Sequence, residues 1–222
     1  MDTHKEEINE ILDALKNGVY EDLDESQFYY DVVQPFADSY TKPYQYDTGA
    51  TKGVLLFKDL GFVIKIPFCR NSDTYDEYYE CCDYFTGADA DNGWDYCEAE
   101  AYKYNRAELE GLNECFAKCE KIAEIDGYPI YIQEYAEIYR FMEDKTPHNE
   151  EETSQVSSIC NSKGFYIFNL DWLSDVFYYF GEKVFYKLLD FIDLVGINDL
   201  HDKNIGYIGD RPVLVDYSSY DQ

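Results

Sequence analysis

The chain has 222 residues, a length that fits one domain or one two-lobed unit with a cleft. Hydrophobic residues make up 45% and aromatic residues 18%, which is enough for a packed core and excludes a disordered chain. The 46 acidic and 18 basic residues give a formal net charge of −28, which repels nucleic acids and anionic membranes. Such a charge is typical of a soluble cytoplasmic protein, or of an acidic face that occupies a partner's basic groove.

The N-terminal residues are charged and amphipathic and lack the apolar core of a secretion signal. No stretch approaches 18 uninterrupted apolar residues, so we expect no membrane span and a cytoplasmic protein. The cysteines include no zinc-type CxxC pair, so we expect buried, reduced thiols. The seven cysteines are Cys69, Cys81, Cys82, Cys97, Cys115, Cys119 and Cys160.

The first expected element is a helix over roughly residues 4–17, in a segment 1–45 that forms an N-terminal helical extension. Thr3 is a suitable N-cap and Gly18 a stop signal. One face carries apolar residues at helical spacing, namely Ile8, Ile11, Leu12 and Leu15. The aromatic, acidic sequence that follows, up to about Tyr46, is expected to be irregular with one further short helix.

Residues 53–68 predict two strands joined by a turn, because an apolar β-rich run precedes an alternating one. Residues 69–95 predict a loop, since they are rich in acids, glycine and asparagine. A helix is expected over 95–110, with a second helical piece at 119–124. Residues 127–136 predict a strand that ends in a polar crossover.

Residues 143–158 are polar and lack periodic apolar positions, which predicts a flexible linker or surface loop. Two helices are expected next, over 171–180 and 182–195, the second with a wide apolar face. The remaining residues predict a loop, a short strand, a Gly-Asp-Arg turn at 209–211 and another short strand.

The candidate catalytic and metal-binding residues lie in this last part of the chain. Asp199 is followed five residues later by Asn204, and an apolar strand then ends in Asp216. A loop carboxylate can orient an acceptor hydroxyl, while an amide oxygen and a second carboxylate suit a hard Mg²⁺ ion. The alternative is structural: Asp199 and Asp202 cap turns, and Asn204 begins a hairpin.

The D-L-H-x-x-N sequence from Asp199 to Asn204 resembles the catalytic loop of the protein-kinase-like superfamily, closest to its aminoglycoside phosphotransferase and choline kinase branch. The Val-Asp-Tyr-Ser sequence around Asp216 resembles the RIO kinases. The resemblance implies a two-lobed α+β fold that binds ATP and Mg²⁺. It implies a small antiparallel-sheet N-lobe over 46–136 and a reduced helical C-lobe over 137–222 that carries both loops. A compact acidic product of this kind also resembles phage or prophage proteins.

Further residues fit the same resemblance in the N-lobe. Lys65, in Val-Ile-Lys-Ile, resembles the strand lysine that binds ATP phosphates. By itself, a lysine among alternating apolar residues is typical of a solvent-facing strand position. The sequence from Gly49 to Gly53 is a degenerate version of the glycine-rich loop, whose backbone amides can cradle phosphate.

The strand lysine of the family pairs with a helix carboxylate, for which the sequence offers Glu98 and Glu100. Tyr104 and Ala107 follow Glu100 at helical spacing, so Glu100 is preferred as the residue nearer the apolar face. The alternative for either glutamate is a solvated acidic helix face. The sequence Gln-Glu-Tyr-Ala resembles the hinge between lobes, where the backbone of Glu134 and Ala136 would meet the adenine edge.

The sequence also departs from the family. Ile197 replaces the histidine that usually precedes the catalytic aspartate, and Tyr217 follows the metal aspartate where a Phe-Gly pair is usual. We expect a reduced C-lobe without an activation segment or peptide-docking helices, and we expect residues 1–45 to pack in place of those helices.

The sequence and the resemblance lead to two alternative hypotheses about function. The first is an ATP- and Mg²⁺-dependent phosphotransferase, in which Lys65 and Asp199 serve catalysis and Asn204 and Asp216 hold the metal. Its acceptor is a hydroxyl on a protein or a small molecule. The second is a non-catalytic, kinase-like binding protein, such as a phage inhibitor of a host nucleic-acid enzyme with a basic groove. Expected partners are a nucleotide and a basic host protein, with no nucleic acid and no membrane.

Overall fold

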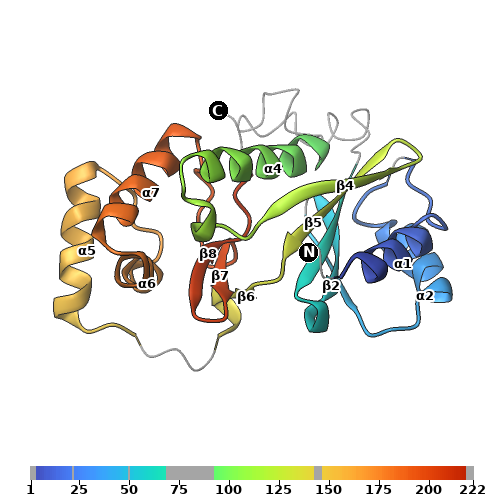
Figure 1. Cartoon of the computed structure of the whole chain (residues 1–222), viewed down its shortest axis with the longest axis horizontal. Helices are drawn as coiled ribbons and strands as arrows, with labels where there is room; N and C mark the ends of the chain where they lie inside the picture. The colour runs from blue at the N-terminus through green and yellow to red at the C-terminus, as the bar shows by residue number, and fades with distance from the viewer. Residues whose placement is uncertain (1–3, 22, 50, 69–92, 143–146, 219–222) are drawn as a thin grey trace, which may run out of the picture. The chain divides into compact units, whose positions relative to one another are not determined.

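The computed structural model describes residues 4–21, 23–49, 51–68, 93–142 and 147–218. The chain forms two compact units, each with its own sheet. The first comprises residues 1–99 and 119–135, and the second comprises 100–118 and 136–222. The expected α+β class is confirmed, with an antiparallel sheet in the first unit (Figure 1).

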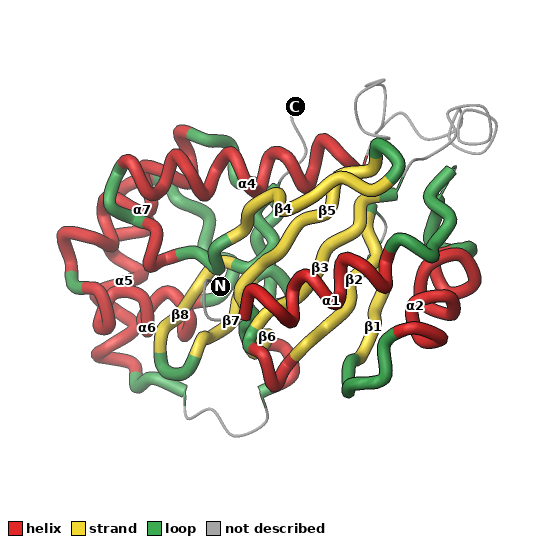
Figure 2. Tube along the Cα trace, turned by 45° about the vertical axis from the view of Figure 1, so that its right-hand side comes forward, coloured by secondary structure: helices red, strands yellow, loops and turns green. Residues whose placement is uncertain are grey.

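The sheet of the first unit has five antiparallel strands in the order β1-β2-β3-β5-β4, which Figure 2 shows side by side. Their bounds are β1 Gln45–Thr48, β2 Lys52–Phe57, β3 Phe62–Pro67, β4 Cys119–Ile125 and β5 Tyr128–Glu134. The predicted strands at 53–68 and 127–136 are thus confirmed. The predicted turn between β2 and β3 is a short 3₁₀ segment, Lys58–Leu60, and it closes at Gly61 with φ of 74°.

The N-terminal segment packs on one face of this sheet. It forms α1 (Lys5–Leu15), a π-helical turn (Tyr29–Val33) and α2 (Gln34–Ser39). The expected first helix and the additional short helix are therefore confirmed. Apolar side chains of these helices share a core with alternate residues of the strands. The helices contribute Ile11, Leu15 and Phe36, and the strands contribute Leu55, Ile64 and Ile132.

The expectation that residues 1–45 replace helices of a reduced C-lobe is therefore wrong. The physical reason is the alternation of the strands. Residues two apart point to the same side of a sheet, and here they present a continuous apolar face to the N-terminal helices.

The expected helical piece at 119–124 is also wrong, because this sequence is strand β4. β4 pairs with β5 through a two-residue turn in which Asp126 has φ of 51° and Gly127 has φ of 86°. Positive φ at both positions is typical of the hairpin turns that favour Asp-Gly. The pairing with β5 outweighs the local helical preference of the Glu- and Lys-rich sequence.

Helix α4 (Gly93–Leu109) confirms the helix expected at 95–110, and its residues from Glu100 onward belong to the second unit. The two helices predicted next are α6 (Leu170–Phe180) and α7 (Glu182–Leu194). The predicted terminal strands are β7 (Ile205–Ile208) and β8 (Arg211–Leu214), drawn in red in Figure 1. They form a three-stranded sheet with β6 (Glu137–Ile138), in the order β6-β7-β8.

The predicted linker at 143–158 is wrong over residues 150–158, which belong to α5 (Glu150–Lys163). Asn149 and Glu152 form a capping box at its start, in which each side chain accepts a hydrogen bond from the other residue's backbone N–H. Val156, Ile159 and Cys160 are the buried residues of this helix. A strong cap and this narrow apolar stripe hold a mostly polar sequence in a helix that packs on α6.

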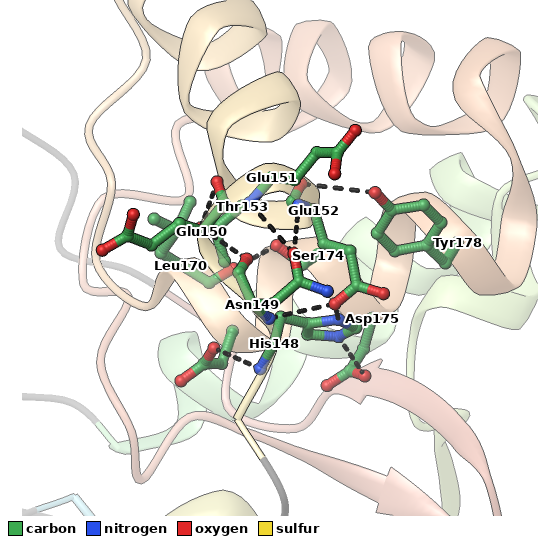
Figure 3. A network of polar contacts seen from close by, with 11 residues as sticks. His148, Asn149, Glu150, Glu151, Glu152, Thr153, Leu170, Ser174, Asp175 and Tyr178 are labelled. Carbon is green, nitrogen blue, oxygen red and sulfur yellow. Dashed lines mark hydrogen bonds and ion pairs between the residues drawn. The ribbon is translucent and has the colours of Figure 1, made fainter.

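His148, just before α5, links this helix to α6 (Figure 3). Its Nδ1 lies 3.2 Å from Glu152 Oε2 and its Nε2 lies 3.0 Å from Asp175 Oδ1. Its ring also stacks on Tyr178, and its backbone N–H donates to Asp171. Burial alone lowers the pKa of His148, but the hydrogen bonds to Asp175 and Glu152 outweigh burial and raise that pKa above its ordinary value.

The described cysteines are buried thiols, as expected: Cys97, Cys115, Cys119 and Cys160. Burial raises the pKa of Cys115 to about 12, so this thiol is not an activated nucleophile. Cys69, Cys81 and Cys82, with most of the loop predicted at 69–95, lie outside the described residues. Among the helices that the structure describes, none combines the length and the apolar character that a membrane crossing requires.

Candidate functional site

The loop between α7 and β7 carries the predicted catalytic aspartate. Asp199 is exposed, and its carboxylate lies 3.8 Å from His201 Nε2. Its backbone carbonyl accepts a hydrogen bond of 2.6 Å from the side-chain Nδ2 of Asn204. Ile197 is buried at the start of the loop, in the position where the kinase-like proteins that the sequence resembles usually have histidine. The loop is therefore held from inside by Ile197 and closed by Asn204, with the Asp199 carboxylate left at the surface.

Asn204 also joins this loop to the residue predicted as the second metal ligand. The backbone carbonyl of Asn204 accepts hydrogen bonds from Val215 N at 2.9 Å and Asp216 N at 3.4 Å. The β7–β8 hairpin makes this possible, because it reverses the chain and pairs Ile205 with Leu214. Residues 12 positions apart in the sequence thus lie side by side in the second unit.

The orientation of the Asn204 side chain suits a metal ligand. Its Nδ2 is committed to the carbonyl of Asp199, so its Oδ1 is directed away from that carbonyl. Within the part of the chain that the structure describes, that Oδ1 accepts no hydrogen bond. Asn204 is buried as a residue, but its Oδ1 keeps some solvent access, because among the described residues the buried side-chain polar atom without a hydrogen bond is the Tyr40 hydroxyl. An amide oxygen is one of the oxygen donors that Mg²⁺ accepts.

The segment after Asp216 is fixed by buried hydrogen bonds. Tyr217 is buried, and its hydroxyl donates 2.8 Å to the carbonyl of Ala117, while its ring packs edge-on against Phe116. The buried Lys103 of α4 donates to the carbonyl of Ser218, whose hydroxyl donates to Asp216 Oδ1 at 3.1 Å. These contacts anchor the backbone that follows Asp216, where Tyr217 and Ser218 stand in place of the Phe-Gly pair expected from the resemblance.

Further residues support this loop, and of these the sequence pointed only to Asp202, as a residue that caps a turn. The Asp202 carboxylate accepts a hydrogen bond of 2.7 Å from Asn169, the N-cap of α6, and its carbonyl accepts one from Arg140 N. Trp172 is fully buried and donates through Nε1 to the carbonyl of Gly206. A Cβ on Gly206 would lie 2.4 Å from the carbonyl oxygen of Glu137, so only glycine fits this strand position. Asp202 thus has a structural role.

Lys65 lies on the face of the first unit's sheet opposite the N-terminal helices. It alternates with Ile64 and Ile66, which belong to the apolar core, and its register partners are Val54 and Tyr131. Lys65 is only 4% exposed, so the alternative of a solvent-facing strand lysine is wrong. This face also contains the buried polar residues Lys52 and Gln133.

The candidate phosphate loop joins β1 and β2. Gly49 is exposed and its backbone N–H donates to Lys52 O at 2.9 Å, which closes the turn. Gly53 has a separate structural reason to be glycine. A Cβ there would lie 2.3 Å from the nearest atom of the buried Phe28 ring. The absence of a side chain at Gly53 thus makes room for the N-terminal segment, and phosphate binding by this loop stays a prediction.

The two helix glutamates differ in burial. Glu100 is fully buried in α4, whereas Glu98 is exposed. This confirms the expectation that Glu100 lies on the apolar side of the helix with Tyr104 and Ala107, both of which are buried. A buried carboxylate requires a polar or charged partner, and Glu100 makes such an interaction.

The predicted hinge lies where the chain passes from the first unit to the second. Glu134 ends β5, and Tyr135 N donates to Gly61 O at 2.9 Å. Ala136 is the first residue of the second unit's final segment and packs with Ala117 and Val213. This sequence is therefore a connection between the units, as the hinge interpretation requires.

Over the described ranges, no group of three or more His, Cys, Asp or Glu side chains is placed to hold a metal ion. The candidate pair of Asn204 and Asp216 falls outside this description, because Asn204 would bind a metal through an amide oxygen. Comparison with models of protein families and with curated protein sequences found no match to this chain.

Proposed function

We propose that the chain is an ATP- and Mg²⁺-dependent phosphotransferase of protein-kinase-like fold, with a protein or small-molecule hydroxyl as acceptor. The observation that carries the proposal is the hydrogen bonding of Asn204 to both Asp199 and Asp216. These bonds engage the backbones of Asp199 and Asp216, and they bring close in the fold the three residues to which the family resemblance gives roles in catalysis and metal binding. The buried Lys65 and Glu100, each an ionisable side chain of low exposure, support the proposal independently.

Each of these residues would have a separate role in phosphate transfer. Asn204 and Asp216 would hold Mg²⁺, and the remaining ligands would be phosphate oxygens and water. Bound Mg²⁺ supplies charge that neutralises the phosphate oxygens. The exposed carboxylate of Asp199 would accept a hydrogen bond from the acceptor hydroxyl and orient it. We assign phosphate binding to Lys65.

The test of nucleotide binding is a thermal shift with ATP and Mg²⁺. A ligand present at 100 times its Kd stabilises the folded chain by about 2.7 kcal/mol. For a chain of this size, the corresponding rise in Tm is about 5–10 °C. Asp216→Asn should remove most of this rise, whereas Asp193→Asn, which changes an exposed carboxylate of α7, should retain it. A wild-type chain without any shift would refute the proposal.

Transfer of labelled phosphate from ATP to basic proteins, to aminoglycosides or to the chain itself then tests catalysis. Asp199→Asn should keep the thermal shift and lower the rate of transfer by roughly 10²–10⁴-fold.

The second candidate function, a non-catalytic acidic binding protein, is favoured by the net charge of −28. It predicts no transfer by the wild type, and partner binding that Asp216→Asn leaves unchanged.

A further inference from the structure

Three tyrosines form an exposed aromatic cluster on the first unit. Tyr29, Tyr30 and Tyr46 are 45%, 67% and 46% exposed. The Tyr29 ring lies 5.2 Å from that of Tyr30, nearly perpendicular to it, and 5.7 Å from that of Tyr46. Tyr29 and Tyr30 come from the π-helical turn and Tyr46 from strand β1. The cluster is therefore a product of the tertiary structure.

The backbone explains why these rings face solvent. In the segment Tyr29–Val33 the π-helical turn buries Val32 and Val33 against the sheet, with Phe28 buried just before it. The two tyrosines that begin the turn then point outward side by side. π-Helical turns are rare and occur frequently at functional sites.

Strand β1 supplies the third ring and leaves the cluster accessible. β1 is an edge strand, and its residues Gln45, Tyr46 and Asp47 are all exposed. Thr48, at its end, donates to Glu25 Oε1 at 3.4 Å, which ties the strand to the loop before the π-helical turn. Edge strands in native proteins are usually short or charged, and a polar, aromatic edge of this kind is suited to contact with another chain.

The acidic residues around the cluster indicate which kind of partner this surface attracts. Between residues 17 and 51 the sequence has seven acidic residues and one basic residue, Lys42. Lys42 is paired with Glu10 at 2.5 Å, so its charge is offset within the chain. Glu25 and Asp47 are exposed beside the cluster. This surface repels nucleic acid and a second copy of the same chain, both of which are acidic, and attracts cations.

We propose that Tyr29, Tyr30 and Tyr46 form a docking surface for an arginine-rich segment of a partner protein. Arginine stacks on aromatic rings and is weakly hydrated, whereas lysine is a strongly hydrated point charge. Tyrosine is enriched among the residues that contribute most to protein interfaces. All residues of the surface lie in the first unit, so the inference does not depend on the phosphotransferase assignment.

The test measures binding of fluorescein-labelled nona-arginine and nona-lysine peptides to the full chain by fluorescence polarisation at ~0.1 M salt. The wild type should prefer the arginine peptide. Tyr30→Ala/Tyr46→Ala should bind the arginine peptide roughly five- to tenfold more weakly and lose the preference. Tyr102→Ala/Tyr166→Ala is the matched control, because its tyrosines are 56% and 78% exposed and its net charge is the same. The control should bind within about twofold of the wild type.

Tyr30→Phe/Tyr46→Phe keeps the rings and should retain the affinity, which separates loss of stacking from loss of folding. Equal weakening in the cluster variant and the control, or no weakening in the cluster variant, would overturn the proposal, because attraction would then come from net charge alone. Sedimentation velocity provides the remaining outcome. A wild-type dimer that Tyr30→Ala/Tyr46→Ala dissociates would make a second copy the occupant and would likewise overturn the proposal.

Discussion

The side-chain Nδ2 of Asn204 donates a hydrogen bond of 2.6 Å to the backbone carbonyl of Asp199, five residues earlier in the chain. The same residue accepts hydrogen bonds from the backbone of Val215 and Asp216 through its own carbonyl. Asn204 is therefore both a candidate metal ligand and the residue that holds the loop closed. Replacing it affects folding even in the absence of nucleotide.

Asn204→Asp should destabilise the chain by about 1–3 kcal/mol, because a carboxylate oxygen would face the Asp199 carbonyl where a donor is needed. The free energy of unfolding from urea titration measures this effect. Asn161→Asp changes an exposed asparagine of α5 and should stay within about 0.5 kcal/mol of the wild type. Equal stability of the two variants would show that the loop does not depend on this hydrogen bond.

Gly53→Ala should destabilise the first unit, because the new Cβ would lie within 2.5 Å of three Phe28 ring atoms. Overpacking of this kind costs about 1–3 kcal/mol. Gly49→Ala is the matched control, since the nearest atom to its Cβ would be Lys52 O at 3.8 Å. Phe28→Leu should recover part of the loss in the Gly53→Ala background. Additive losses in that double variant would contradict the steric explanation.

Tyr217→Phe removes the hydroxyl that donates to Ala117 and keeps the buried ring. Loss of one buried hydrogen bond should cost about 1 kcal/mol in the free energy of unfolding. Since Tyr217 follows Asp216, the variant should also show a smaller Tm rise with ATP and Mg²⁺. Tyr166→Phe, at an exposed tyrosine, should change neither quantity. A normal thermal shift in Tyr217→Phe would mean that Asp216 is positioned without this contact.

The His148 network should make stability depend on pH. The pKa of His148 is raised in the folded chain, so its contribution is complete below the unfolded pKa of about 6.5 and is lost as pH rises through the folded pKa. The hydrogen bond from Asn149, with His148, lowers the pKa of Glu152. The Glu152 contribution is therefore lost only as pH falls through that lowered pKa.

The measurement is the difference in free energy of unfolding between the wild type and His148→Gln. It should be larger at about pH 5.5 than at about pH 8.5. Asp175→Asn should reduce this pH dependence, because Asp175 faces His148 Nε2 and also accepts a hydrogen bond of 2.5 Å from Tyr207. The groups that face His148 from the packed elements are Glu152 of α5, Asp171, Asp175 and Tyr178 of α6. A difference that is the same at both pH values would contradict the assignment.

Local sequence patterns determined many of the helices and strands of this protein and the position of one candidate loop. Alternation predicted β3, helical spacing predicted α1 and α7, and the Asp-to-Asn spacing located the loop before β7. Two signals were present but missed. Asp126-Gly127 is a hairpin turn sequence, and Asn149 with Glu152 is a capping box, so β4 and the start of α5 could have been expected.

Only the tertiary structure decided the remaining features, because they depend on contacts between residues distant in the sequence. The packing of Phe28 on Gly53, the burial of Lys65, and the anchoring of Tyr217 on Ala117 have no local signal. A sequence pattern reports which side of a strand or helix a residue occupies, but not which distant chain segment covers that side. That covering segment determines whether a charged side chain is exposed to solvent or buried.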